Sequence, residues 1–125
     1  QVAFIKDSGI YCYAPAIGTA HGFYKSTPEI CYEHLERLVA ATGVPMVLHG
    51  GSGLGDAVFR RLIALGTAKV NISTALKKTY NDGFRSYLDA HPREYDPQKL
   101  IAAVHGEVMQ MAQTYFTLFG SAGRV

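Results

Sequence analysis

The sequence has few cysteines, little net charge and no long apolar run. Its two cysteines, Cys12 and Cys31, stand in no CxxC or Cys/His spacing, which predicts reduced, partly buried thiols in a cytoplasmic protein. The formal net charge of +2 is too small to indicate a nucleic-acid or anionic-membrane partner. No apolar run approaches the ~20 residues that a membrane span requires, and the first residues lack the charged and apolar regions of a signal peptide.

The size and composition are those of a globular domain. With 125 residues, 48% of them hydrophobic and 18% charged, the chain is expected to form a single domain over residues 1–125 with a buried core. It has no initiator Met, and its first residues resemble the middle of an element. We therefore expect the chain to be part of something longer.

Short apolar strands alternate with glycine-rich turns and amphipathic helices. Pro15 cannot donate to a ladder, so the paired part of the first strand is expected to begin at Ala16 and end at His21. The remaining expected elements are a helix that starts at Ser26–Glu29 and stops at Gly43, a strand at Met46–Leu48, a helix capped by Asp56, a strand at Ala68–Asn71, a helix reaching about His91 and a final helix starting at Asp96–Pro97.

This alternation predicts an α/β fold built from parallel βαβ units. The apolar strands are expected to be buried on both faces. Ligands in such folds bind at the carboxyl ends of the strands, where the glycine and polar turns fall here. Three strands cannot close an eight-stranded barrel, so the chain forms either a small open sheet or part of a barrel.

Two histidines follow apolar runs and are each followed by glycine. They lie in Gly18-Thr19-Ala20-His21-Gly22 and in Met46-Val47-Leu48-His49-Gly50. Neutral imidazole binds Zn²⁺ well, and catalytic zinc sites commonly have three protein ligands, of which these histidines can supply two. The alternative is that each is a hydrogen-bonded structural histidine. His34, His91 and His105 fall on expected helices or at their ends, where surface or structural roles are expected.

Two turns have the character of a phosphate site. Gly50-Gly51-Ser52-Gly53 can present several backbone N–H groups and a hydroxyl to an anion. Asn71, Ser73 and Thr74 stand between a strand and a helix, so the free N–H groups of that helix's first turn are available as well. Ordinary turn and cap chemistry is the alternative for each stretch taken alone.

Other phosphate and nucleophile motifs are absent. Gly51-Ser52-Gly53-Leu54-Gly55-Asp56 has Asp56 where a dinucleotide fingerprint needs glycine or alanine. There is no Gly-Lys-Ser/Thr triple, so the chain has no P-loop. Gly50-Gly51-Ser52-Gly53-Leu54 lacks the last glycine of a nucleophile elbow.

Taken together, these motifs resemble those of the class II fructose-bisphosphate and tagatose-bisphosphate aldolases. The resemblance rests on Gly18–Gly22, His49–Gly53, Asn71-Ile72-Ser73-Thr74 and Phe119-Gly120-Ser121-Ala122-Gly123, which follow in order over nearly the whole chain. It implies a (β/α)₈ TIM barrel, of which this chain holds roughly the last three strand–helix units plus a C-terminal helix.

The resemblance also implies a site and a reaction. His21 and His49 are then zinc ligands, and dihydroxyacetone phosphate, as part of a sugar bisphosphate, is held by Gly22, Gly50, Gly51, Ser52, Asn71, Ile72, Ser73 and Thr74. A monovalent cation near the glycine turn and a homodimer or homotetramer are further expectations. The expected reaction is reversible cleavage of a ketose 1,6-bisphosphate, fructose or tagatose, to dihydroxyacetone phosphate and glyceraldehyde 3-phosphate.

One part of that machinery is not in the sequence. The family's proton-donating aspartate and its adjacent zinc-binding histidine lie on an earlier strand, and no Asp-His pair occurs here. A non-catalytic sugar-phosphate-binding fragment or subunit that assists a catalytic partner is therefore the alternative function. A phosphate-binding isomerase or epimerase on the same barrel is a third possible function.

No lysine Schiff base is expected, and Lys69 is assigned no covalent role.

Overall fold

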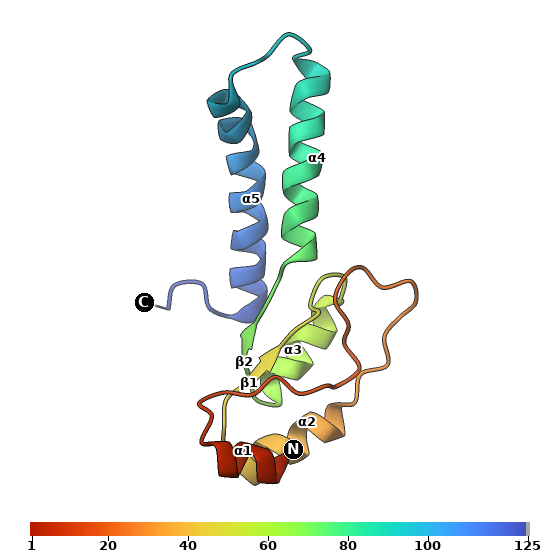
Figure 1. Ribbon diagram of the computed structural model, residues 1–125, viewed down its shortest axis with the longest axis vertical. Coiled ribbons are helices and arrows are strands. Elements are labelled where there is room, and N and C mark those ends of the chain that lie inside the picture. The colour runs from red at the N-terminus through yellow and green to blue at the C-terminus, as the bar shows by residue number, and fades with distance from the viewer. Residues whose placement is uncertain (125) are drawn as a thin grey trace. The chain divides into compact units, whose positions relative to one another are not determined.

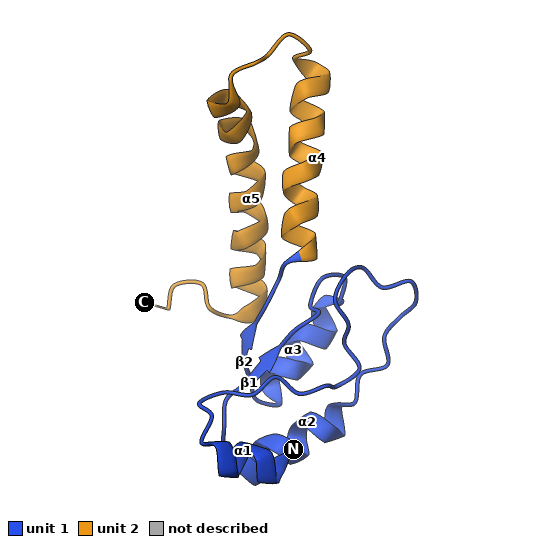
Figure 2. Ribbon diagram, viewed as in Figure 1, with its two compact units in different colours: residues 1–73 blue, residues 74–125 orange. Residues whose placement is uncertain are grey.

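The computed structural model describes residues 1–124 as an α/β protein made of two compact units, residues 1–73 and 74–125 (Figure 2). The first unit contains α1 (Val2–Ser8), α2 (Tyr32–Thr42), β1 (Met46–Leu48), α3 (Asp56–Ala64) and β2 (Thr67–Val70), and the second contains α4 (Thr74–Ala90) and α5 (Pro97–Phe119). The expectation of one domain over residues 1–125 stays a prediction.

The two strands are parallel neighbours, and Leu48 on β1 pairs with Val70 on β2. All three residues of β1 are buried, as predicted for a strand covered on both faces. On β2, by contrast, Ala68 and Lys69 are exposed, so the expectation of burial on both faces is wrong for this strand. The predicted parallel arrangement and the position of Met46–Leu48 are confirmed.

The first strand is shorter and earlier than the sequence suggests. Tyr13 forms an isolated parallel bridge with Met46, in which Tyr13 N–H donates to the Pro45 carbonyl at 3.0 Å and Val47 N–H donates to the Tyr13 carbonyl at 2.8 Å. The expected pairing from Ala16 to His21 is wrong. One reason is that the Ile17 carbonyl accepts from Cys31 N–H at 2.9 Å instead of from a strand.

This same bond explains why α2 begins later than expected. Cys31 is its N-cap and Ser26–Glu29 are not helical, so the predicted helix start is wrong. The chain before Cys31 lies against the first histidine segment, where a Cβ on Gly18 would be 2.1 Å from the Glu29 carbonyl oxygen. The predicted stop is confirmed, because Gly43 ends α2 with a left-handed φ of 65°.

Helix α3 lies beside the strands (Figure 1) and supplies much of the core of the first unit. Phe59 is 1% exposed and Leu62 is 0% exposed, as their helical spacing predicts. Asp56 is the first helical residue rather than the cap, which is Gly55, so the expected Asp56 cap is wrong. Its carboxylate lies in the first turn, where the helix dipole favours negative charge.

The second unit is an antiparallel hairpin of α4 and α5 (Figure 1). The predicted start of α5 is confirmed: Asp96 is its N-cap and accepts from Gln98 N–H at 2.8 Å, with proline in the first turn. The helices approach closely at Gly83, where an added Cβ would be 3.1 Å from a methyl of the buried Val104. Glycine therefore sets the spacing of the hairpin.

Cys12 and Cys31 are free thiols as expected, but both are exposed, so their predicted partial burial is wrong. Among the residues described, none of the helices is both long enough and apolar enough to traverse a bilayer.

Candidate metal and phosphate site

The first histidine turn of the site is built by β1. Three buried apolar residues, Met46 to Leu48, end at His49, whose side chain is exposed, and Gly50 follows with a φ of 68°. The change from buried to exposed comes where the strand ends. The left-handed glycine then turns the backbone sharply. An imidazole is thereby placed at the carboxyl end of the strand, the edge where ligands bind in parallel α/β folds.

The neighbouring strand places Asn71 beside this imidazole. Asn71 N–H extends the ladder by donating to the Leu48 carbonyl at 2.9 Å, and Asn71 Nδ2 lies 3.0 Å from His49 Nε2. Lys69, two residues earlier, donates from Nζ to Asn71 Oδ1. Because an ammonium group can only donate, it fixes the amide oxygen on its own side and directs the amide NH₂ group to His49.

The second histidine turn arrives from irregular backbone. His21 is exposed, and its ring centroid lies 5.5 Å from that of His49 at an interplanar angle of 69°. The two residues are 28 positions apart in the chain, yet the fold brings their rings together. The segment that carries His21 does not pair as a strand. Contact between the two histidine turns holds it in place.

The spacing of the two imidazoles suits a zinc ion. Two imidazoles that share one tetrahedral ion, with Zn–N bonds of about 2.0–2.1 Å, have ring centroids about 5 Å apart. The observed separation of 5.5 Å fits, and neutral imidazole is a preferred ligand of zinc. Within residues 1–124 there is no group of three or more His, Cys, Asp or Glu that could hold an ion.

The glycine turn after His49 is closely packed. A Cβ on Gly50 would lie 2.4 Å from the Ala20 carbonyl oxygen, and one on Gly51 would lie 2.8 Å from Cδ1 of Ile72. Glycine is therefore required at position 50, where the contact is with backbone and φ is 68°, whereas the contact at position 51 is with the end of the Ile72 side chain. Ser52 is 2% exposed, and the Gly51 carbonyl accepts from Leu54 N–H at 3.2 Å. The turn thus joins both histidine segments and the end of β2.

The remaining predicted substrate residues lie after His21 and after β2. Gly22 follows His21 with a φ of 100° and has open space around it. Asn71 and Ile72 are half-buried next to the glycine turn, and Ser73 is exposed. Thr74 is the first residue of α4 and belongs to the second unit. The first unit thus gathers Gly50, Gly51, Asn71 and Ile72 close to the histidines.

Two residues around the histidines were not singled out by the sequence. The Tyr24 hydroxyl accepts from Ala20 N–H at 3.1 Å and donates to the Gly50 carbonyl at 2.7 Å. Lys69 orients Asn71. The signal for Lys69 was available, because residues two apart on a strand share a face. The partners of Tyr24 follow only from the contact between the two turns.

The other histidines lie outside this site. His34 Nε2 is 2.8 Å from Gln1 Oε1, and the His91 ring stacks on Tyr87 with centroids 4.4 Å apart. His105 is an exposed residue of α5.

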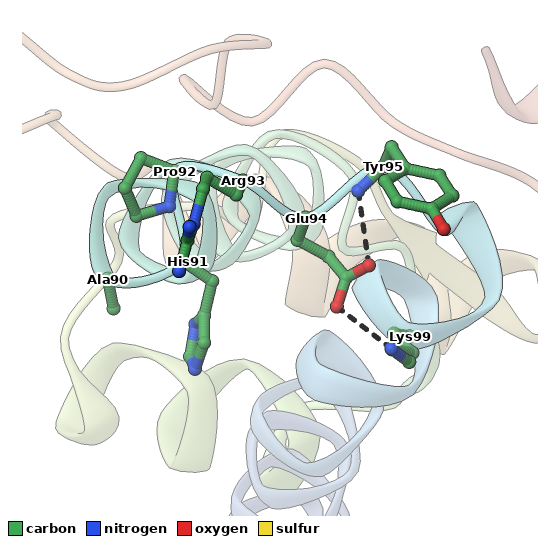
Figure 3. A pocket seen from close by; sticks show the side chains of 7 residues that line it. All are labelled: Ala90, His91, Pro92, Arg93, Glu94, Tyr95 and Lys99. Atoms are coloured by element: carbon green, nitrogen blue, oxygen red, sulfur yellow. Dashed lines mark hydrogen bonds and ion pairs between the residues drawn. The ribbon is translucent and has the colours of Figure 1, made fainter.

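A separate hollow lies at the tip of the helical hairpin. It is lined by Ala90, His91, Pro92, Arg93, Glu94, Tyr95 and Lys99 (Figure 3). Glu94 accepts from the backbone N–H groups of Tyr95 and Asp96 and pairs with Lys99 at 3.2 Å. The Asp96 N–H bond, followed by the Lys99 charge, lowers the pKa of Glu94, and Glu94 in turn raises the pKa of Lys99. The Glu94 carboxylate and the Lys99 ammonium group form an ion pair, which connects the turn after α4 to α5.

Comparison with known proteins adds the family context. The model of the family described as fructose-bisphosphate aldolase class-II matches residues 1–124. A fructose-bisphosphate aldolase of Geobacillus stearothermophilus is 36% identical over 120 residues, and so is a probable fructose-bisphosphate aldolase of Bacillus subtilis. Each alignment covers 96% of this chain and 42% of the relative. The chain thus spans less than half the length of these curated relatives.

Solved structures agree with this match. The YdjI aldolase from Escherichia coli K12 superposes with a TM-score of 0.87 at 35% identity, over 98% of this chain and 45% of that chain. A putative fructose-1,6-bisphosphate aldolase from Coccidioides immitis superposes with a TM-score of 0.88 at 27% identity, over 98% and 42% of the two chains. The arrangement of elements in this chain therefore recurs in about half of each larger structure.

Proposed function

This chain belongs to the class-II fructose-bisphosphate aldolase family, and we propose that the protein containing it is a zinc-dependent ketose-bisphosphate aldolase. In this proposal, residues 1–125 form the last three strand–helix units and the C-terminal helix of a (β/α)₈ barrel. The parallel strands and the likeness to solved aldolases support that assignment. The substrate is fructose or tagatose 1,6-bisphosphate, cleaved to dihydroxyacetone phosphate and glyceraldehyde 3-phosphate.

The observation that carries the proposal is the meeting of two imidazoles next to a glycine turn. His21 and His49, with ring centroids 5.5 Å apart, are the proposed zinc ligands. Zinc, when bound, supplies a Lewis acid that polarises the ketose carbonyl and stabilises the negative charge left when the C3–C4 bond breaks. Asn71 contacts the His49 ring, with its Nδ2 3.0 Å from His49 Nε2.

The glycine turn is the proposed phosphate holder. Gly50 has the left-handed backbone conformation that an anion-binding nest uses, and Gly51 and Ser52 follow it directly. Asn71, Ile72 and Ser73 follow β2, and Thr74 begins α4, the position at which backbone N–H groups commonly bind anions. Gly22 completes the proposed set. Holding the phosphate in this way aligns the reacting carbons with the metal.

Further parts of the proposal concern the protein as a whole. The proton donor is assigned to a residue outside this chain, a monovalent cation is expected near the glycine turn, and the protein is expected to be a cytoplasmic homodimer or homotetramer. The cytoplasmic location follows from the reduced cysteines that the sequence predicts, and the other expectations follow from the family resemblance.

The test is cleavage of fructose and tagatose bisphosphate by the full-length protein before and after chelation. We expect activity to disappear with the metal and to return with added zinc. The H21A and H49A variants are expected to be inactive, while H105A, which changes an exposed histidine of α5, is expected to keep full activity. Full activity without metal, or borohydride trapping of a substrate adduct on the protein, contradicts the proposal.

A sugar-phosphate-binding protein without turnover is the second candidate. It is favoured by the content of the site, because the proposed phosphate-holding residues are in this chain whereas residues 1–124 contain no group of three or more candidate metal ligands. Calorimetric binding of the bisphosphate with no cleavage in the presence of zinc would support it. Conversion of the bisphosphate to an isomer, rather than to two trioses, would indicate an isomerase or epimerase.

A further inference from the structure

The hydroxyl of Tyr24 joins the two histidine turns. It accepts a hydrogen bond from Ala20 N–H at 3.1 Å and donates one to the Gly50 carbonyl at 2.7 Å. Ala20 immediately precedes His21, and Gly50 immediately follows His49. A single oxygen atom therefore connects the backbones on either side of the paired imidazoles.

Only a group that both donates and accepts can make this connection. One of the two backbone groups is a donor and the other an acceptor, so an ether would leave the Gly50 carbonyl without this partner, and a methyl or a phenyl edge would leave both without it. A hydroxyl has one donor and two acceptor positions. The bonds span four residues on one side and 26 on the other, so they fix the two turns relative to each other rather than either turn internally.

The surrounding contacts restrict where the hydroxyl can go. A Cβ on Gly53 would lie 3.5 Å from Cδ2 of Tyr24, so the ring lies against the last glycine of the glycine turn. The two turns also touch directly, since Gly50 has no room for a Cβ next to the Ala20 carbonyl. The Tyr24 ring is half-buried and held on one side by this backbone.

We propose that Tyr24 is a positioning residue for the metal: its hydroxyl sets the separation of the His21 and His49 turns and thereby the affinity for zinc. This inference rests on the proposed function, in which both histidines bind one zinc ion. Tyr24 contributes no ligand. Its effect is transmitted through the backbone that carries the ligands. Partners of this kind, behind metal ligands, typically change metal affinity or activity by about 10–100-fold when removed.

The experiment is the Y24F variant of the full-length protein, which removes one oxygen and keeps the ring. The zinc dissociation constant is measured by competition with a chromophoric chelator. We expect Y24F to bind zinc at least about 10-fold more weakly than the wild type does. The matched control is Y32F: Tyr32 is also half-buried in the first unit, but it contributes its ring face, with the Arg61 guanidinium 3.8 Å from the centroid. We expect Y32F to bind zinc with unchanged affinity.

Circular dichroism and denaturant unfolding of the metal-free proteins separate positioning from folding. A metal-free Y24F protein that is folded at the assay temperature and binds zinc weakly supports the inference. Unchanged zinc affinity in Y24F overturns it, and so does weak binding that merely follows partial unfolding of the metal-free variant. A wild-type protein that binds no zinc at all contradicts the proposed function itself, whereas equal binding by wild type and Y24F contradicts only the role of Tyr24.

Discussion

Asn71 Nδ2 lies 3.0 Å from His49 Nε2, and the amide oxygen of Asn71 accepts from the Lys69 ammonium group. The parallel pairing of β1 and β2 produces this contact, since both strands end at the same edge. An amide held in this way orients one imidazole and stands next to the glycine turn, so it connects the proposed metal site with the proposed phosphate site.

The first prediction concerns this amide. In the full-length protein, N71A is expected to lower kcat/KM for the bisphosphate by about 10–100-fold, because it removes both the partner of His49 and a proposed substrate contact. Steady-state kinetics at saturating zinc provide the measurement. N81A, which changes an exposed asparagine of α4, is the control. A less than twofold change for N71A would show that the amide is dispensable.

The second prediction concerns Gly50. G50A adds a methyl group 2.4 Å from the Ala20 carbonyl oxygen to a residue with a φ of 68°. G43A imposes the same left-handed strain, with a φ of 65°, but in open space. We expect G43A to lower the free energy of unfolding by about 1–2 kcal/mol and G50A to lower it by about 1–3 kcal/mol more.

Denaturant unfolding of the metal-free proteins measures this difference without interference from metal affinity. Equal losses for G50A and G43A would contradict the close contact between the two histidine turns, because only that contact distinguishes the two variants.

The third prediction concerns the helical hairpin. G83A is expected to destabilise the protein by about 1–3 kcal/mol, since its methyl group would meet the buried, β-branched Val104 at 3.1 Å. G106A, in the interior of α5 with open space around it, is expected to stabilise by about 0.5–1 kcal/mol because alanine favours helix over glycine. Thermal unfolding tests both. Stabilisation by both substitutions would contradict the packing of α4 on α5.

The fourth prediction is a pH dependence at the turn between α4 and α5. The bond from Asp96 N–H, together with Lys99, lowers the pKa of Glu94. Since the pKa is lower in the folded state than the value of about 4.3 in the unfolded chain, this contribution to stability is present above that value. It is lost as the pH falls through the folded-state pKa.

E94Q removes this contribution. Its free energy of unfolding is therefore expected to be lower than that of the wild type at neutral pH, and the gap is expected to narrow as the pH falls toward about 3. Urea unfolding across this range is the measurement, with D89N, which changes an exposed carboxylate of α4, as control. A difference in the free energy of unfolding between wild type and E94Q that widens in acid would contradict the lowered pKa of Glu94.

Elements with strong local signals could be predicted from the sequence. Met46–Leu48 is a buried strand of apolar residues, and α5 begins where Asp96 caps it. The predictions of the first strand and of the start of α2 were wrong for a common reason. Both depend on the bond between Cys31 N–H and the Ile17 carbonyl, a contact between segments whose sequences give no sign of it.

The site, too, could be predicted in part from the sequence. The His-Gly pairs and the glycine turn could be recognised because residue type and strand position restrict what they can do. The proximity of the His21 and His49 rings follows from the fold. Tyr24 could not be predicted, because its partners are two backbone groups that become neighbours only when the turns meet.

The measurement that tests the central claim most directly is the zinc content of the full-length protein after dialysis, determined by elemental analysis for the wild type and for H21A, H49A and H105A. Binding of one ion by both imidazoles predicts one equivalent of zinc in the wild type and in H105A, and a large loss in H21A and in H49A alike. A full equivalent of zinc retained by either H21A or H49A would contradict the shared site.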